Sequence, residues 1–195
     1  IKYSVKELIK SKICSDIIIS TDSKNYQKLF SKIFPKKINI FKRSKRHATD
    51  KSSSESALLE IINFNQNINN YDNCLFVQLT SPLVKQNDFK NAYRYFIKNN
   101  FDSLFTGYFS KKFFWYEKKN KLIPMNYNPY KRPRRQNFKG SIVENGAFYI
   151  FKIRKFIKEK NRIFGKIGCH LMPENRSLEI DKKEDIDLLK FYLKK

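Results

Sequence analysis

Two acidic side chains near the end of the sequence are spaced so that they could hold one cation. The stretch SLEID, residues 177–181, places Glu179 and Asp181 two positions apart. Residues two apart on an extended strand point to the same side, so both carboxylates can converge on one ion. Proteins bind Mg²⁺ with a few carboxylates together with phosphate oxygens, as in nucleotidyl transfer. We therefore predict a magnesium site at these two residues; the alternative is that Asp181 only caps the helix that follows.

Uncharged polar side chains follow a predicted strand in the middle of the chain. Residues 74–79 are apolar except for Gln78, and Thr80, Ser81 and Pro82 come next. Amide and hydroxyl groups at the end of a strand suit the recognition of a ligand with many hydroxyls. Gln78 and Thr80 are therefore candidate binding residues, and a purely structural turn is the competing interpretation.

Basic residues in two further segments could bind an anionic ligand. The loop from Arg43 to Ser53 combines positive charge with hydroxyls, which could hold a nucleotide, or it is a solvated loop. Arg134 and Arg135 could bind a carboxylate or a phosphate through paired hydrogen bonds. The block that follows, residues 144–149, contains Asn145 before a glycine, which is also an ordinary turn sequence.

Alternating helix-like and strand-like segments would bring these side chains to one edge of a sheet. Apolar spacing predicts helices at 4–13, 25–34, 54–65, 88–98 and 184–193, and strands at 16–20, 38–41, 74–79, 103–108, 147–151 and 167–172. This order predicts an α/β fold: a Rossmann-like, doubly wound and mostly parallel sheet with helices on both faces. Ligands bind at the carboxyl ends of the strands in such sheets.

Residues 111–142 interrupt the alternation with an aromatic, basic and proline-bearing stretch. A stretch of this length without clear periodicity inside one domain is usually functional. Its aromatic side chains would suit a dimerisation arm, so we predict one domain over residues 1–195, with this arm inserted in it, and a homodimer. The alternative is that the aromatic side chains pack locally within one chain.

Taken in order, these blocks resemble the acylneuraminate cytidylyltransferase (CMP-sialic acid synthetase) family over essentially the whole chain. The blocks are STDS at 20–23, Arg43 with Asp50, QLTSPL at 78–83, RRQ at 134–136, ENGAFYIF at 144–151 and SLEID at 177–181. The sequence departs from the family pattern at Ser44, Val84 and Glu179, where the family has Pro, Arg and Asp. The resemblance implies a fold of the nucleotide-diphospho-sugar transferase type.

The same resemblance implies an enzyme that joins CTP to a 2-keto-3-deoxy sugar acid of the N-acylneuraminate type, giving CMP-sugar and pyrophosphate. The implied nucleotide-binding residues are Arg43 and Ser53, and the implied substrate-binding residues are Gln78, Thr80, Asn145 and Tyr149. The implied catalytic residues are Asp181, Gln78 and Arg135, and the implied Mg²⁺ ligands are Asp181 and Glu179. The family opens with a strand and a basic, glycine-containing loop for the triphosphate. We expect both to be missing from residues 1–195, so that this chain alone turns over CTP poorly.

Several alternatives remain open at this point. The acid could instead be legionaminate, pseudaminate or Kdo, or the chain could be an inactive, truncated remnant. The net charge of +23, from 41 Lys and Arg against 18 Asp and Glu, also suits a basic RNA-binding protein. The lysines are scattered, however, and no RNA-binding motif is recognised, so we expect no nucleic-acid partner.

The sequence also indicates where the protein works. No apolar run reaches the roughly 18 residues that span a membrane, and the first residues do not resemble a secretory signal. Its three cysteines are far apart, which suits reduced thiols rather than disulfides or a zinc site. We therefore expect a cytoplasmic protein that does not bind membranes.

Overall fold

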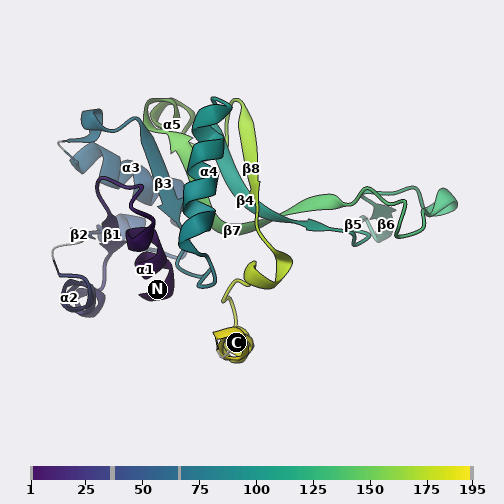
Figure 1. Ribbon diagram of the computed structural model, residues 1–195, viewed down its shortest axis with the longest axis horizontal. Coiled ribbons are helices and arrows are strands. Elements are labelled where there is room, and N and C mark those ends of the chain that lie inside the picture. Colours follow the sequence, from purple (N-terminus) through teal and green to yellow (C-terminus); the bar gives the residue numbers. More distant parts are fainter. Residues whose placement is uncertain (1, 36–37, 66, 194–195) are drawn as a thin grey trace.

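The centre of the protein is a sheet of four strands, β3 (Asn73–Val77), β7 (Ser141–Lys152), β4 (Ser103–Ser110) and β8 (Ile167–Leu171), in that order. The structure is a computed structural model that describes residues 2–35, 38–65 and 67–193. β7 is antiparallel to β3 and to β4, and β4 is parallel to β8, so β3, β4 and β8 share one direction. The predicted α/β fold with a mostly parallel sheet is thus confirmed, with β7 as the reversed strand (Figure 1).

The apolar residues of β7 make it the buried middle of this sheet. Residues 147–151 are at most 2% exposed, as expected for a strand covered on both faces. Phe148 and Ile150 face the helix α4 (Gln86–Lys98), while Tyr149 and Phe151 face α3 (Ser54–Phe64) and α5 (Ile153–Glu159). The sequence analysis did not predict α5, which is a short helix in a strongly basic stretch.

A separate pair of parallel strands lies beside the central sheet. β1 (Ile18–Thr21) is joined through α2 (Lys24–Ile33) to β2 (Asn39–Lys42). In the described part of the chain β1 pairs only with β2, and β3 pairs only with β7. The helix α1 (Lys2–Ser11) leads into β1 and packs against α4.

The arm predicted at 111–142 is present and contains a hairpin, so the interpretation as a stretch without regular structure was wrong. Its strands are β5 (Trp115–Lys118) and β6 (Lys121–Pro124), joined by two residues with positive φ, a common hairpin geometry. The arm projects from the ends of β4 and β7 (Figure 1). Three ring pairs pack within it, at centroid distances of 4.3–5.7 Å; they are Phe113–Tyr127, Phe113–Phe138 and Trp115–Tyr127.

The last helix, α6 (Lys183–Leu193), agrees with the prediction, but the stretch before it does not form the predicted strand. Residues 178–181 are extended without belonging to a sheet, because only one ladder-like bond, from the Ile180 N–H to the Thr80 carbonyl at 2.8 Å, attaches them. None of the helices among the described residues is both long and apolar enough to cross a membrane.

A buried ion pair fastens this C-terminal segment to α4. Asp88 is 6% exposed and accepts the Lys85 N–H, while its two oxygens face the guanidinium of Arg176, with Nη2 2.9 Å from Oδ1. His170 Nε2 lies 3.8 Å from the same carboxylate. Burial alone would raise the pKa of Asp88, but hydrogen bonding with His170, Arg176 and the backbone outweighs it and holds that pKa well below its usual value.

Replacing Asp88 by asparagine tests this attachment. The amide leaves the charge of Arg176 unpaired, so we expect the free energy of unfolding at pH 7 to fall by about 2–4 kcal/mol. Because the pKa of Asp88 is depressed in the folded chain, its contribution is present above the roughly 3.9 of an unfolded aspartate and is lost as the pH falls toward the folded value. The difference between the two proteins should therefore narrow below about pH 4 in urea unfolding.

The matched control is Asp187→Asn on α6. Asp187 is exposed and pairs with Lys190 at 2.8 Å within one helix turn, so its loss should change the unfolding free energy by less than about 0.5 kcal/mol. Equal stabilities for the Asp88→Asn and Asp187→Asn proteins would show that the buried pair does not anchor the segment.

Candidate active site

The end of β3 is where the predicted site residues meet. Gln78 directly follows the strand, and its N–H donates to the Ala147 carbonyl of β7 at 3.1 Å. Two residues on, the Thr80 carbonyl accepts the N–H of Ile180 at 2.8 Å. This bond brings Glu179 and Asp181 to the polar edge of the sheet, beside Gln78 and Thr80.

Gly146 is the floor on which two of these side chains meet. Its φ is +59°, and a Cβ built there would overlap the carboxylate of Glu179 and lie 2.7 Å from the side-chain oxygen of Gln78. The position therefore needs glycine twice, for its backbone angle and for the close approach of both side chains. The predicted pairing of Gln78 with the acidic segment is present in the geometry.

Three carboxylates share this edge: Glu179, Asp181 and Glu144 of β7. The pKa of Glu179 is raised, first by burial and then by the negative charges of Asp181 and Glu144. A cation placed here would relieve that repulsion, and oxygen ligands are those that Mg²⁺ prefers. In the described ranges, however, no three acidic, histidine or cysteine side chains are arranged to hold a metal by themselves. An ion would need phosphate oxygens to complete its shell.

Tyr149 is locked in place beside these acids. Its hydroxyl donates to Glu144 Oε1 at 2.6 Å, and its ring stacks on Phe76 with a centroid distance of 6.0 Å. The guanidinium of Arg162 lies 4.6 Å from the ring centroid and pairs with Glu55 of α3 at 3.0 Å. Burial, followed by the charge of Glu144, raises the pKa of Tyr149 to about 12, so the phenol remains a proton donor at neutral pH.

The sequence analysis missed Glu144 and Arg162 as site residues. Glu144 stood inside the recognised ENGAFYIF block, so its acidic charge was a usable signal. Arg162 lies in the loop after the unpredicted helix α5, and nothing in its sequence neighbourhood marked it.

Asn145 supports the site from behind. It is 2% exposed, its Nδ2 donates to Ser177 Oγ at 2.9 Å, and its Oδ1 accepts the N–H of Ala147. Substrate contact by Asn145 stays a prediction, while its observed bonds tie β7 to the segment that carries Glu179.

Asp181 does not cap the last helix, contrary to the structural alternative. The carboxylate of Asp185 takes that role, accepting the N–H groups of Asp181 and Lys182 at 2.9 and 2.8 Å. The side chain of Asp181 is exposed, as a ligand for a cation would be.

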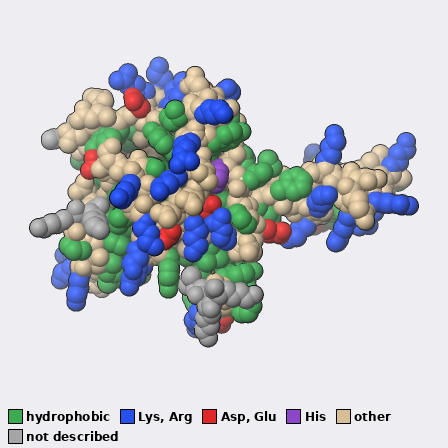
Figure 2. Space-filling view, viewed as in Figure 1, with side chains coloured by type: hydrophobic (Ala, Val, Ile, Leu, Met, Phe, Trp, Pro, Cys, Tyr) green, Lys and Arg blue, Asp and Glu red, His purple; other side chains and the backbone are tan. Residues whose placement is uncertain are grey.

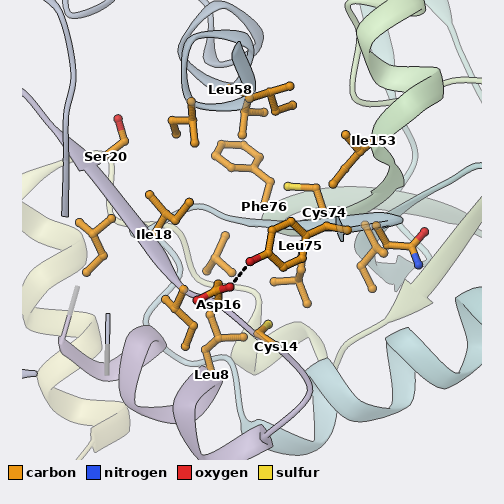
Figure 3. Close-up of a pocket in the computed structure, with 18 of the residues that line it drawn as sticks. Leu8, Cys14, Asp16, Ile18, Ser20, Leu58, Cys74, Leu75, Phe76 and Ile153 are labelled. Carbon is orange, nitrogen blue, oxygen red and sulfur yellow. Dashed lines mark hydrogen bonds between the residues drawn. The ribbon is translucent and has the colours of Figure 1, made fainter. Parts of the chain in front are cut away.

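The predicted nucleotide-binding residues lie across from this cluster. Arg43 follows β2, with its N–H on the Thr21 carbonyl and its guanidinium 3.5 Å from Asp22. Arg43, Gln78 and Thr80 all line one cavity of about 810 Å³ between β1 and β3 (Figure 3). Ser53, in contrast, accepts the N–H of Ser56 at 3.1 Å and caps α3. Its contact with a nucleotide stays a prediction.

Arg135 is not brought to the cluster within one chain. It lies exposed on the projecting arm, where its carbonyl accepts from Lys111 Nζ at 3.2 Å. Figure 2 shows other Lys and Arg side chains spread over both body and arm on the visible face rather than gathered into one basic patch. That distribution gives the RNA-binding alternative no support.

Known proteins provide an independent comparison. A family model described as cytidylyltransferase matches residues 1–195. N-acylneuraminate cytidylyltransferase A of Danio rerio is 29% identical over 191 residues, which cover 96% of this chain but only 42% of that protein. The pseudaminic acid cytidylyltransferase of Campylobacter jejuni is 27% identical over 199 residues, covering 100% of this chain and 84% of that protein.

Solved structures share the fold at lower identity. The 4-diphosphocytidyl-2C-methyl-D-erythritol synthase of Anaerococcus prevotii matches with a TM-score of 0.70 at 13% identity, covering 100% of this chain and 88% of that one. CMP:2-keto-3-deoxy-manno-octonic acid synthetase, complexed with CTP, matches with a TM-score of 0.65 at 9% identity, covering 98% and 87%. Because the family match extends over the whole sequence, the chain belongs to the cytidylyltransferase family.

Proposed function

We propose that the protein uses CTP to activate a 2-keto-3-deoxy sugar acid, releasing pyrophosphate. The observation that carries this proposal is the meeting of Gln78 and Glu179 over Gly146, on the rim of a cavity that also includes Arg43. The anomeric hydroxyl of the acid forms a bond to the α-phosphorus of CTP as the bond to the bridging oxygen breaks. Pyrophosphate takes that electron pair, and the proton of the hydroxyl is released.

The residues divide the work by their chemistry. Gln78 and Thr80 present neutral polar groups to the sugar hydroxyls, and Arg43 presents positive charge to the nucleotide. Asp181 and Glu179 would hold Mg²⁺, which when bound neutralises charge on the phosphates. Tyr149 keeps Glu144 oriented through the 2.6 Å hydrogen bond, and so fixes the third negative charge of the edge.

The nine-carbon N-acylneuraminate type is the substrate that we propose first. The relatives include enzymes named for N-acylneuraminate and for pseudaminic acid at similar identities, so the choice among acids rests on experiment. We measure pyrophosphate release with CTP and each of N-acetylneuraminate, pseudaminate, legionaminate and Kdo, and equilibrium binding of CTP and UTP. The proposal expects CTP to bind in preference to UTP and one acid to stimulate release. A protein that shows neither property would overturn it.

Substitutions at the two acids test the metal role. Asp181→Asn removes the exposed anionic ligand, so we expect pyrophosphate release to fall on the order of 100-fold. Glu179→Gln should be milder, about tenfold, and partly rescued by raised Mg²⁺, because Glu179 is half-buried and has the longer arm. Glu179→Asp should retain activity. Rates across a Mg²⁺ titration, with Asp187→Asn as the surface control, decide the matter; near-normal turnover by Asp181→Asn would end the metal-ligand assignment.

We also propose that the arm joins two copies of the chain. Leu122 and Tyr130 are 71% and 95% exposed on it, and Arg135 can reach a site only by way of a second copy. Because Ser110 and Ser141 are paired, an Asn-Gly turn can replace residues 111–140 without disturbing β4 or β7. Sedimentation should show a dimer for the intact chain and a monomer for the deletion. A deletion protein that still dimerises would place the interface elsewhere.

A further inference from the structure

The cavity between β1 and β3 has the walls of a place for a strand. It follows both strands along their length, from Asp16 to Ser20 on one side and from Asn73 to Gln78 on the other. Leu8 of α1 and Leu58 of α3 close it from opposite faces, as the close-up shows (Figure 3). Its volume of about 810 Å³ lies in the upper part of the roughly 300–1,000 Å³ typical of a ligand pocket.

The two strand edges that face this cavity run in the same direction. At their amino ends the Tyr71 hydroxyl donates to the Asp16 carboxylate, and beyond their carboxyl ends Leu79 packs with Ile19. Neither facing edge has a ladder partner in the chain as described. Backbone N–H and C=O groups left unpaired beside an apolar space are costly, and an added strand would satisfy both edges.

The helix α1 shows how such a strand would be connected. Its amino end lies at the carboxyl edge of the sheet, where Ser4 Oγ donates to the Ser81 carbonyl at 3.0 Å. Its other end leads to Cys14 and into β1, at the opposite edge. A strand parallel to β1 and β3 would end where α1 begins, making a strand–helix–strand unit like that of β1, α2 and β2.

We propose that this cavity is the seat of an apolar polypeptide strand of about five residues, parallel to β1 and β3 and joined to the amino end of α1. Apolar side chains are required on both faces, since Leu8 and Leu58 wall it on opposite sides. The strand would merge the two sheets into one in the order β2, β1, added strand, β3, β7, β4, β8. Residues after its carboxyl end would emerge beside Arg43 and Gln78, over the candidate site.

A fusion tests the proposal without reference to catalysis. Val-Ile-Val-Ile-Val and a short Gly-Ser linker are placed before Ile1, and the control fusion carries Asp-Ser-Asp-Ser-Asp instead. Cys14 and Cys74 line the cavity, so a seated strand should slow their reaction with a thiol reagent about tenfold relative to the control, with Cys169 as an internal reference. Amide exchange in β1 and β3 should slow as well, and Tm should rise by about 3 °C or more.

The outcomes separate the possible occupants. Equal thiol and exchange rates in the two fusions would overturn the proposal. So would protection of Cys14 and Cys74 in the unfused chain that grows with protein concentration, because a second copy would then fill the cavity. If the apolar fusion is insoluble, the peptide Lys-Lys-Val-Ile-Val-Ile-Val-Lys-Lys is added to the unfused chain, and the same rates decide between protection and its absence.

Discussion

The bond between the Ile180 N–H and the Thr80 carbonyl is the contact on which the proposed chemistry depends. It is a single ladder-like bond, and it alone links the acidic segment directly to the end of β3 among the described backbone bonds. The Asp88–Arg176 pair and the Asn145–Ser177 hydrogen bond hold the same segment from the side. Together they fix two carboxylates against their mutual repulsion, which the raised pKa of Glu179 records.

The buried strand β7 links this constraint to the rest of the fold. Its apolar residues join the two packed faces of the sheet, while its amino-terminal half carries Glu144 and Gly146 to the polar edge. The division between the β1–β2 pair and the central sheet sets the other wall, where Arg43 lies. A basic group and a carboxylate cluster therefore face each other across one opening, as a nucleotide and its metal require.

Much of this arrangement could be predicted from the sequence, because continuous apolar runs and helical spacing depend only on local burial. The run at 147–151 gave a strand, although its reversed direction depends on pairing that no local pattern encodes. The resemblance implied that an opening strand is not among these residues, and the sheet is interrupted between β1 and β3. Glu179 and Asp181 were expected on a strand, but only one neighbour bond forms there. Arg162 depends on contacts made by distant helices, which left no mark in sequence.

The central claim is that the side chains meeting over Gly146 bind CTP together with Mg²⁺. The most direct measurement is the affinity for CTP, with and without Mg²⁺, of Gly146→Ala and of Gly165→Ala. Both glycines have positive φ and a carboxylate against the space a Cβ would fill, so both variants should lose about 1–3 kcal/mol of stability. The account predicts at least a tenfold weaker Mg²⁺-dependent CTP affinity for Gly146→Ala alone. Equal CTP affinities for the two variants would contradict it.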